Sequence, residues 1–199
     1  MNKPFSQACE NNKKSILAKL ILAFAQSKHI LEIGTGTGQH AVYFARHLPK
    51  LNWQTSDLLI NHQGINQWID EFPANNIQRP IPIDLNLPWP SCPLKTIDGI
   101  FTANTLHIVS WSLVIQFFKG IAYQLSAGGT ICIYGPFNYK GQFTSDSNAN
   151  FDLWLKEINV NSGIRDFEAI VALAKTVKLQ LLADHEMPAN NRLLVFTKN

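Results

Sequence analysis

The sequence has few cysteines and no long apolar run. Three cysteines occur in 199 residues, at positions 9, 92 and 132, without the CxxC or Cys/His spacing of a zinc site, so we expect neither a disulfide framework nor a metal. No apolar run reaches the roughly 18 to 20 residues that a bilayer-spanning helix requires, and the start lacks the apolar core of a signal peptide. These absences predict a cytoplasmic protein that does not enter the membrane.

Charge is also sparse, because only 16% of the residues are charged and the net charge is +3. The basic residues are scattered and form no block, so nothing indicates a nucleic-acid partner. Hydrophobic residues make up 46% of the chain, which is typical of a compact domain with a sizeable core. Without repeats or linkers, residues 1–199 are expected to form one domain, and no pattern indicates an oligomeric state.

Strand and helix patterns alternate along the chain. Strands are expected at 29–33, 51–56, 77–83, 97–103 and 129–134, with helices between them and a first helix capped by Asn12. This alternation predicts a parallel sheet with helices on both faces, and Pro80 and Pro82 place the third strand at an edge. Asp166 is the predicted cap of a last helix, which two strands follow. Their short connection predicts a hairpin and therefore an antiparallel final strand.

The glycine-rich turn after the first strand is the main chemical signal. Gly34, Gly36 and Gly38 alternate between a strand and a helix, where they let the backbone turn sharply beside free helix N–H groups. A nucleotide-like ligand is therefore expected at the carboxyl ends of the strands. Asp57 follows the second strand, where it can accept hydrogen bonds from ribose hydroxyls, and Asp84 follows the third, where it can accept one from an adenine amino group. A solvated acid or a cap remains the alternative for both.

The run LEIGTGTG at residues 31–38 resembles motif I of class I S-adenosylmethionine-dependent methyltransferases. Its acidic Glu32 stands two positions before the first glycine, where dehydrogenases of the NAD type usually have an apolar or small residue. Further segments together resemble the methyltransferase-like 26 family (domain of unknown function 938) over nearly the whole chain, at residues 3–12, 38–41, 108–111, 134–137, 163–166 and 187–193.

This resemblance implies a three-layer Rossmann-like class I methyltransferase fold, an α/β fold with a mostly parallel seven-stranded sheet and an antiparallel last strand. It also implies S-adenosyl-L-methionine as the cofactor, with Glu32 at the methionine end, Asp57 at the ribose, Asp84 by the adenine and Asn104 where the methionine part and the acceptor meet. The residues expected to bind the cofactor are Glu32, Gly34, Thr35, Gly36, Gly38, His40, Asp57, Leu58, Asp84, Leu85 and Asn104.

Methyl transfer from a sulfonium is an in-line displacement, so holding the nucleophile near the methyl carbon can supply much of the acceleration. A general base is needed only when the acceptor must lose a proton. His107 is the predicted base and His40 the second candidate, although a lone histidine more often packs or caps. Tyr134 is expected on the acceptor side.

The connection over 137–165 is long and rich in aromatic residues, asparagine and serine. It is expected to be an insertion near the acceptor site, or a short helix docked on the core, because four apolar residues between 151 and 158 have helical spacing. Phe137, Asn190 and Asn191 are expected to bind substrate, although the two asparagines also fit a turn. Residues 1–12 are expected to fold over the cofactor as a lid, or to fray.

The sequence therefore predicts a methyltransferase acting on an unidentified small-molecule or protein acceptor that has a planar or moderately apolar group. Two alternatives stay open. An NAD(P)-dependent oxidoreductase fits because residues 36–41 also satisfy GxGxxA, although Glu32, the chain length and the closing hairpin favour methyl transfer. A non-catalytic scaffold that keeps the fold and binds a partner protein is the second alternative.

Overall fold

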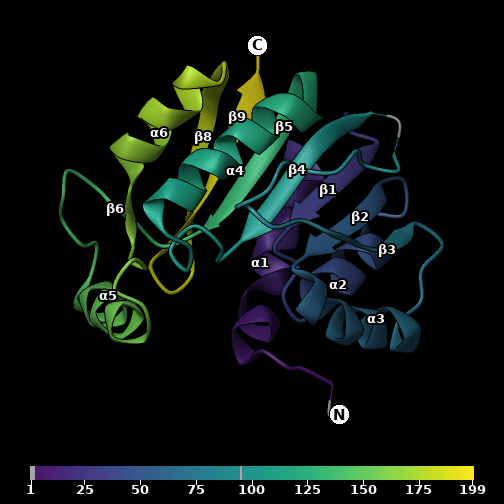
Figure 1. Ribbon diagram of the computed structural model, residues 1–199, viewed down its shortest axis with the longest axis horizontal. Coiled ribbons are helices and arrows are strands. Elements are labelled where there is room, and N and C mark those ends of the chain that lie inside the picture. The colour runs from purple at the N-terminus through teal and green to yellow at the C-terminus, as the bar shows by residue number, and fades with distance from the viewer. Residues whose placement is uncertain (1–2, 95) are drawn as a thin grey trace.

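The computed structural model describes residues 3–94 and 96–199. Seven strands form its central sheet in the order β3-β2-β1-β4-β5-β9-β8 (Figure 1). They are β1 (His29–Ile33), β2 (Asn52–Asp57), β3 (Ile77–Pro82), β4 (Ile97–Ala103), β5 (Leu125–Gly135), β8 (Leu179–Met187) and β9 (Asn191–Lys198). β1 to β5 pair in parallel, and β9 pairs antiparallel with both of its neighbours. The predicted seven-stranded sheet with a reversed last strand is confirmed, and β3 lies at its edge.

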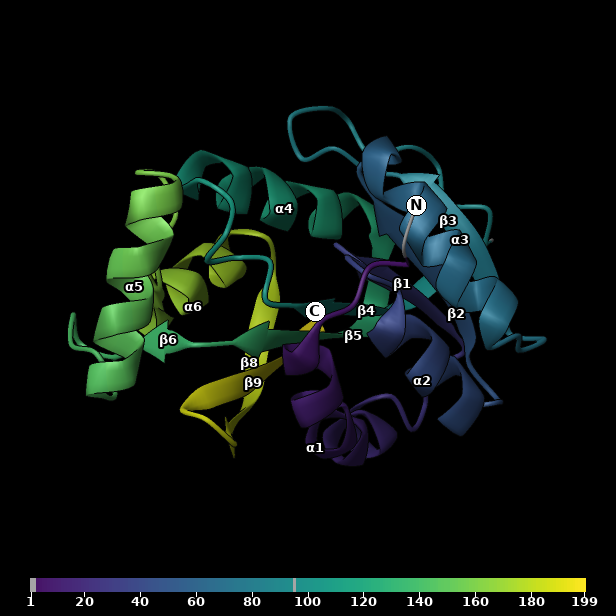
Figure 2. The ribbon, with the colours of Figure 1, turned by 90° about the horizontal axis from the view of Figure 1, so that it is seen from below.

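Helices cover both faces of this sheet, which gives three layers (Figure 2). On one face lie α1 (Gln7–Ala23), α2 (Gln39–His47) and α3 (His62–Glu71), and on the other lie α4 (Trp111–Gln124) and α6 (Phe167–Thr176). Successive side chains of a strand point to opposite faces. Phe101 therefore packs in the core under α1 and α2, whereas its neighbour Ile100 packs in the core under α4 and α6.

One of the two predicted helix caps is wrong, and the other lies at its predicted position. α1 begins at Gln7, with Ser6 as its cap, so the predicted cap at Asn12 is wrong and Asn12 lies inside the helix. The first turns of α1 are polar and show no apolar periodicity, which hid the true start. Asp166 does precede α6, but its side chain makes no capping hydrogen bond.

The segment between β5 and α6 forms an appendage, which we define as residues 137–166. It contains the short parallel strands β6 (Phe137–Asn138) and β7 (Arg165–Asp166) and the helix α5 (Asp146–Ile158), so the helix predicted there is confirmed. α5 docks on the β8–β9 hairpin, because Asn148 Nδ2 donates to the Asn190 carbonyl and Asn190 Nδ2 donates to Ser147 Oγ, both at 3.2 Å.

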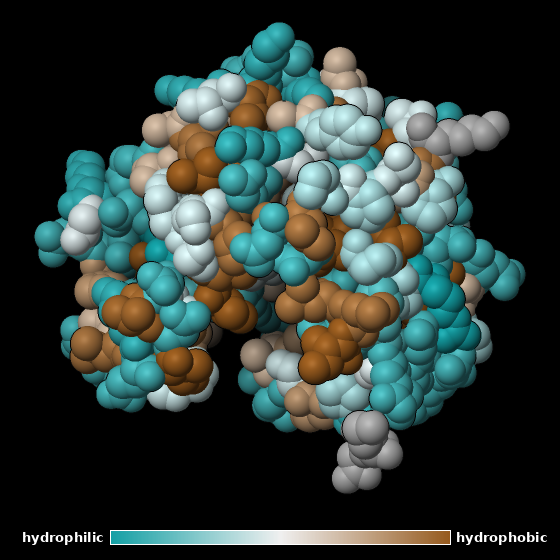
Figure 3. Space-filling model, viewed as in Figure 1, coloured by the Kyte–Doolittle hydropathy of each residue, from teal (hydrophilic) through white to brown (hydrophobic). Residues whose placement is uncertain are grey.

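An indentation separates the appendage from the body of the molecule (Figure 3). Apolar side chains gather on both sides of it, and Leu153, Trp154 and Ile158 of α5 are at least half exposed. The carboxyl ends of β1 to β5 point toward this side of the molecule (Figure 1). Within the described part of the chain, no helix has the length and apolarity that a membrane crossing requires.

Candidate functional site

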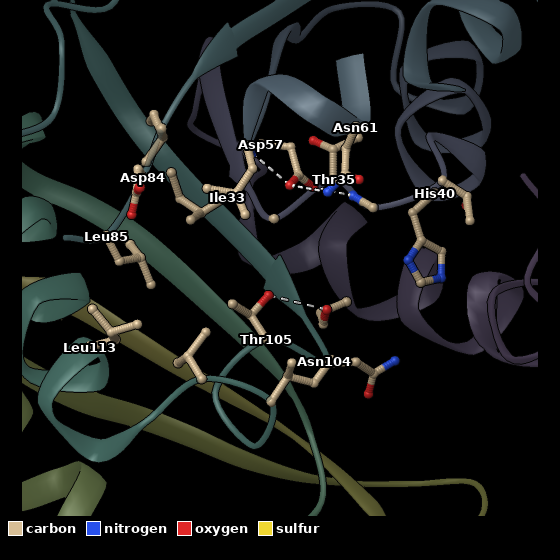
Figure 4. A pocket seen from close by; sticks show the side chains of 18 of the residues that line it. Ile33, Thr35, His40, Asp57, Asn61, Asp84, Leu85, Asn104, Thr105 and Leu113 are labelled. Carbon is tan, nitrogen blue, oxygen red and sulfur yellow. Dashed lines mark hydrogen bonds between the residues drawn. The ribbon is translucent and has the colours of Figure 1, made fainter. Parts of the chain in front are cut away.

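A cavity of about 510 Å³ lies at the carboxyl ends of β1, β2, β3 and β4 (Figure 4). This volume lies within the range of small-molecule sites, and the position is the crevice that an open parallel sheet provides. Nine of the residues predicted to bind the cofactor line it: Gly34, Thr35, Gly36, His40, Asp57, Leu58, Asp84, Leu85 and Asn104. The predicted crevice is therefore present, and most of the predicted side chains meet there.

The glycine turn brings the backbone close to the cavity. Gly34 and Gly36 have φ angles of 70° and 64°, in the left-handed region that favours glycine. A Cβ on Gly34 would lie 2.7 Å from Thr105 Oγ1, whereas a Cβ on Gly36 would meet nothing within 4 Å. Gly38 does not line the cavity, and a Cβ there would lie 3.1 Å from the Ile65 Cα of α3. Gly38 thus serves helix packing, while Gly36 leaves the cavity open.

The carboxylate of Asp57 is held by three donors. Its Oδ2 accepts from the Gly36 N–H at 2.6 Å, and its Oδ1 accepts from the Leu58 N–H and from Asn61 Nδ2, both at 2.7 Å. Asp57 is buried yet lines the cavity (Figure 4). A carboxylate has about four acceptor positions, so one position, on Oδ2, stays free for a ligand hydroxyl.

An apolar slot continues from Asp57 toward Asp84 (Figure 4). Ile33, Leu85 and Leu113 line it, and Asp84 stands at its edge. Asp84 Oδ1 accepts from the backbone N–H and from Nδ2 of Asn86, at 2.8 and 2.9 Å. An apolar slot with an acceptor at its edge suits a planar heterocycle that carries an amino group.

Glu32 lies beneath the glycine turn and does not line the cavity, although it was predicted to bind the cofactor. It is 2% exposed, and its Oε2 accepts from Trp53 Nε1 at 2.7 Å. Burial raises the pKa of its carboxyl to about 8, the hydrogen bond from Trp53 lowers this pKa, and the nearby charge of Asp57 raises it. The bond from Trp53 thus ties the side chain of Glu32 in β1 to β2.

The other end of the cavity faces α1. His40 and Asn104 lie on this side (Figure 4). The Nε2–H of His40 donates to Asn12 Oδ1 at 2.6 Å, and burial lowers the pKa of His40 to about 4, so the ring is neutral near pH 7. Asn104 has a φ of 59°, and its backbone N–H donates to the Tyr134 carbonyl at 2.8 Å. Asparagine is one of the few residues that tolerate this left-handed conformation.

Residues near the N-terminus also border the cavity, through Ser6 and Cys9. The Ser6 N–H donates to Gln39 Oε1, Gln39 Nε2 donates back to the Ser6 carbonyl, and Trp68 Nε1 donates to the Pro4 carbonyl. This segment is therefore tied across α2 and α3. Residues 1 and 2 of the predicted lid lie outside the described residues.

His107, the predicted base, does not line the cavity. Its ring is 5% exposed and packs edge-on against Phe151, with ring centres 5.3 Å apart. Burial lowers the pKa of His107 to about 4, and the charge of Arg165 lowers it further. Tyr134 and Phe137 are buried in the two cores and do not line the cavity either. Strand alternation and the tight turn after β5 explain why these two side chains point inward.

Asn190 and Asn191 form the turn between β8 and β9, away from the cavity. Asn190 has a φ of 56°, and Asn191 Nδ2 donates to the carbonyls of Pro188 and Ala189. Both asparagines therefore have the turn-forming role that was the alternative to substrate binding.

Several cavity residues were not found by sequence reasoning. They are Ile33, Thr37, Asn61, Ile83, Asn86, Ala103, Thr105, Ile108, Val109 and Leu113, whereas Ser6 and Cys9 belong to the segment 1–12 that was expected to fold over the cofactor. Ile33 and Ala103 end strands and Ile83 directly follows one, whereas the others lie in the loops and helices beyond the strand ends. Apolar residues at these positions carry no chemical signature, and only the fold shows that they face a ligand.

Comparison with known families gives one match over nearly the whole chain. The family described as "Protein of unknown function (DUF938)" matches residues 3–198.

Solved structures with a similar fold are methyltransferases of low sequence identity. An O-methyltransferase family protein from Burkholderia thailandensis has a TM-score of 0.79 and 14% identity, over 94% of this chain and 56% of that one. An O-methyltransferase from neocarzinostatin biosynthesis, in complex with S-adenosyl-L-homocysteine and 1,4-dihydroxy-2-naphthoic acid, has a TM-score of 0.79 and 16% identity, over 96% and 55%. A family 2 O-methyltransferase from Planctomyces limnophilus, in complex with apigenin, has a TM-score of 0.75 and 13% identity, over 94% and 62%. The chain thus spans little more than half the length of these proteins, and at this identity the likeness concerns the fold.

Proposed function

This chain belongs to the DUF938 family of proteins of unknown function, and we propose that it is an S-adenosyl-L-methionine-dependent methyltransferase. The family resemblance inferred from the sequence is thereby confirmed. The observation that carries the proposal is that one cavity joins the glycine turn, the fixed carboxylate of Asp57 and the apolar slot ending at Asp84. Solved structures with this fold include one bound to S-adenosylmethionine and one bound to S-adenosylhomocysteine, which supports the same cofactor here.

In this proposal, different cavity residues bind the ribose, the adenine and the methionine part of the cofactor. Asp57 would accept a hydrogen bond from one ribose hydroxyl at the free position on Oδ2, because Gly36, Leu58 and Asn61 already fill the other three positions. The slot between Ile33 and Leu85 holds the adenine, and Asp84 accepts from its amino group. Asn104 faces the methionine end. Glu32 joins β1 to β2 through the bond from Trp53.

When bound, the cofactor would supply a methyl group on a sulfonium: the acceptor nucleophile bonds to the methyl carbon in line as the carbon–sulfur bond breaks, and S-adenosylhomocysteine leaves with the electron pair of that bond. The protein's contribution is to hold the two reactants in this geometry and to exclude water. His40 lines the cavity with a neutral ring whose Nε2–H is bonded to Asn12, so its Nδ1 carries the free lone pair. His40 is therefore better placed than His107 to take a proton from an acceptor that must lose one.

The acceptor in this proposal is an uncharged small molecule with a planar or apolar part. Among the described residues that line the cavity, only Asp57 and Asp84 carry a carboxylate, and none is a lysine or an arginine. Both carboxylates face the adenosine part. Ile108, which lines the cavity, is 55% exposed, and Trp154 of α5 is 51% exposed. These exposed side chains support an apolar acceptor more than an ionic one.

Ligand binding tests the proposal directly. We expect S-adenosylhomocysteine to raise the unfolding temperature of the protein, and Asp57→Asn to weaken its binding by about tenfold or more, because the hydrogen bond from the ribose loses its charged acceptor. Asp70→Asn is the matched control, since Asp70 is exposed on α3 and does not line the cavity. Stabilisation by NADH and not by S-adenosylhomocysteine would identify an oxidoreductase instead.

Turnover needs a separate experiment. Labelled S-adenosylmethionine is incubated with the protein and a fractionated cell extract, and we expect label in the small-molecule fraction. Label that appears in protein alone would contradict a small-molecule acceptor. Binding of S-adenosylhomocysteine without transfer to any fraction would favour the non-catalytic scaffold.

A further inference from the structure

The loop after β4, residues 104–109, forms one wall of the cavity. Asn104, Thr105, Ile108 and Val109 all line it. The loop has no strand or helix to pair its carbonyl groups, and a buried carbonyl without a donor is costly. Some other part of the molecule must therefore provide the donors that give this wall its shape.

Four successive carbonyls of the loop accept hydrogen bonds from one short segment of the appendage, residues 162–165. The Leu106 carbonyl accepts from Arg165 Nε at 3.0 Å, and the His107 carbonyl accepts from the Gly163 N–H at 2.9 Å. The Ile108 carbonyl accepts from Ser162 Oγ at 2.6 Å, and the Val109 carbonyl accepts from a terminal nitrogen of Arg165. The loop and the segment thus form one bonded unit, from residue 106 to residue 109.

This segment is itself anchored on α5. The Asp152 carboxylate is buried, and its Oδ1 accepts from the Ile164 N–H at 2.7 Å while its Oδ2 binds Lys156 Nζ at 2.6 Å. Gly163 passes so close that a Cβ there would lie 3.0 Å from Asp152 Oδ1, and its φ is 155°. The contacts run without interruption from α5 through residues 162–165 to the cavity wall.

We propose that Arg165 is a positioning residue that sets the cavity wall formed by residues 104–109, and that the appendage is therefore part of the cofactor site. The planar guanidinium donates to the carbonyls of Leu106 and Val109 at the same time, and it also donates to the Asn161 carbonyl of the appendage at 3.0 Å. An ammonium group has no such fork and cannot hold both loop carbonyls in one fixed geometry. The proposal rests on the proposed function only in the identity of the bound cofactor.

A simpler role for Arg165 would be to attach the appendage by its charge, since burial lowers the pKa of its guanidinium but the nearby charge of Asp152 opposes this shift. Lysine at position 165 would keep that charge and lose the fork. The pair Arg165→Lys and Arg165→Met therefore separates the two roles.

The first experiment follows hydrogen exchange of the unliganded protein. We expect Arg165→Met to speed exchange of the loop 104–109, where the N–H groups of Ile108 and Val109 are bonded to the Thr105 carbonyl, and to leave β1 and β2 unchanged. This measurement needs no ligand, so it decides the role of Arg165 even when the cofactor proposal fails. Wild-type exchange of the loop in Arg165→Met would overturn the inference.

The second experiment measures the affinity for S-adenosylhomocysteine. We expect Arg165→Met to weaken binding about tenfold and Arg165→Lys to weaken it about threefold. Arg165→Met removes both hydrogen bonds that the charged side chain donates to the loop, and Arg165→Lys removes one of them. Arg79→Met is the matched control, because Arg79 is an exposed arginine of β3 paired with Asp70. Wild-type affinity in Arg165→Lys would assign the residue a charge-based attachment role and contradict positioning by the fork.

A milder variant covers the case in which Arg165→Met does not fold. Ser162→Ala removes one donor to the Ile108 carbonyl and leaves the guanidinium in place. We expect it to speed exchange of the same loop and to weaken binding by about threefold. An unchanged loop in Ser162→Ala, together with an unchanged loop in Arg165→Lys, would also overturn the inference.

Discussion

The Gly36 N–H donates to Asp57 Oδ2 at 2.6 Å, and this bond joins the turn after β1 to the end of β2. The glycine that leaves the cavity open and the acid expected to bind the ribose are therefore joined at one corner of the site. Movement of either strand end would displace both groups together. Changes at this corner should consequently alter ligand affinity more than they alter the fold.

Substitutions at two glycines of the turn should have opposite profiles. Gly36→Ala places a methyl group in open space in the cavity, so we expect a stability loss of about 1 to 2 kcal/mol from the left-handed φ and a large loss of S-adenosylhomocysteine affinity. Gly38→Ala brings its Cβ to 3.1 Å from the Ile65 Cα, so we expect the larger loss of stability. Urea unfolding and calorimetric titration measure the two effects. Equal stability losses in both variants would contradict the assignment of Gly38 to packing.

Glu32 should make the protein less stable as the pH rises. Its pKa is raised by burial from 4.5 to about 8, so the folded state keeps a proton that the unfolded state loses above pH 4.5. Its contribution to stability is therefore full below pH 4.5 and is lost as the pH rises toward 8, at about 1.4 kcal/mol per pH unit.

Glu32→Gln keeps the acceptor for Trp53 and removes this proton linkage. We expect the variant to match the wild type near pH 5 and to exceed it in unfolding free energy at pH 8. Chemical denaturation at the two pH values measures the difference, and Glu71→Gln, at an exposed acid on α3, is the control. An equal pH slope in Glu32→Gln and the wild type would show that Glu32 is ionised in the folded protein at neutral pH.

The buried His107 should cost stability in acid. Its pKa is lowered to about 4, first by burial and then by Arg165, so the unfolded chain takes up a proton below pH 6.5 that the folded protein does not. Its contribution is present above pH 6.5 and is lost as the pH falls to 4, with a total of about 3 kcal/mol. We expect His107→Gln to flatten the fall in unfolding free energy between pH 7 and pH 4.5. His47→Gln, at an exposed histidine, should keep the wild-type slope.

Gln39 should hold the N-terminal segment over the cavity. Its side chain is 2% exposed and bonds both backbone groups of Ser6. Gln39→Leu leaves these groups without partners, so we expect a loss of about 1 to 3 kcal/mol and faster hydrogen exchange in residues 3–10. Gln63→Leu, at an exposed position of α3, is the control. Unchanged exchange of this segment in Gln39→Leu would mean that Trp68 and Pro4 hold it alone.

Local pattern predicted the sheet well because its strands are short, apolar and separated by clear helical periodicity. Asp57 and Asp84, the acids expected at the ribose and the adenine, were found because each stands where a strand ends. The carboxyl ends of parallel strands lie at one edge of the sheet, so the two side chains meet in the cavity. The antiparallel direction of β9 was predictable because only a short connection joins it to β8.

The remaining features depend on distant contacts that no local pattern records. α1 starts among polar residues because Gln39, 33 positions away from Ser6, satisfies the backbone there. His107 seemed well placed beside Asn104, yet the loop turns its ring toward Phe151 of the appendage. The role of Arg165 was likewise invisible, because its partners Leu106 and Val109 lie more than fifty residues earlier in the chain.

The place of β9 between β5 and β8 has a consequence for the order of folding. β8 pairs with no strand of the central sheet except β9, within the described residues, and β9 is the last strand along the chain. During synthesis, β1 to β5 can therefore assemble while β5 still presents an unpaired edge, which is the kind of surface that promotes association between chains. Residues 191–198 then close that edge and recruit β8 in a single step. A ribosome-bound chain that stops before Asn191 should thus be the aggregation-prone species, and chaperone protection should be needed most at that length.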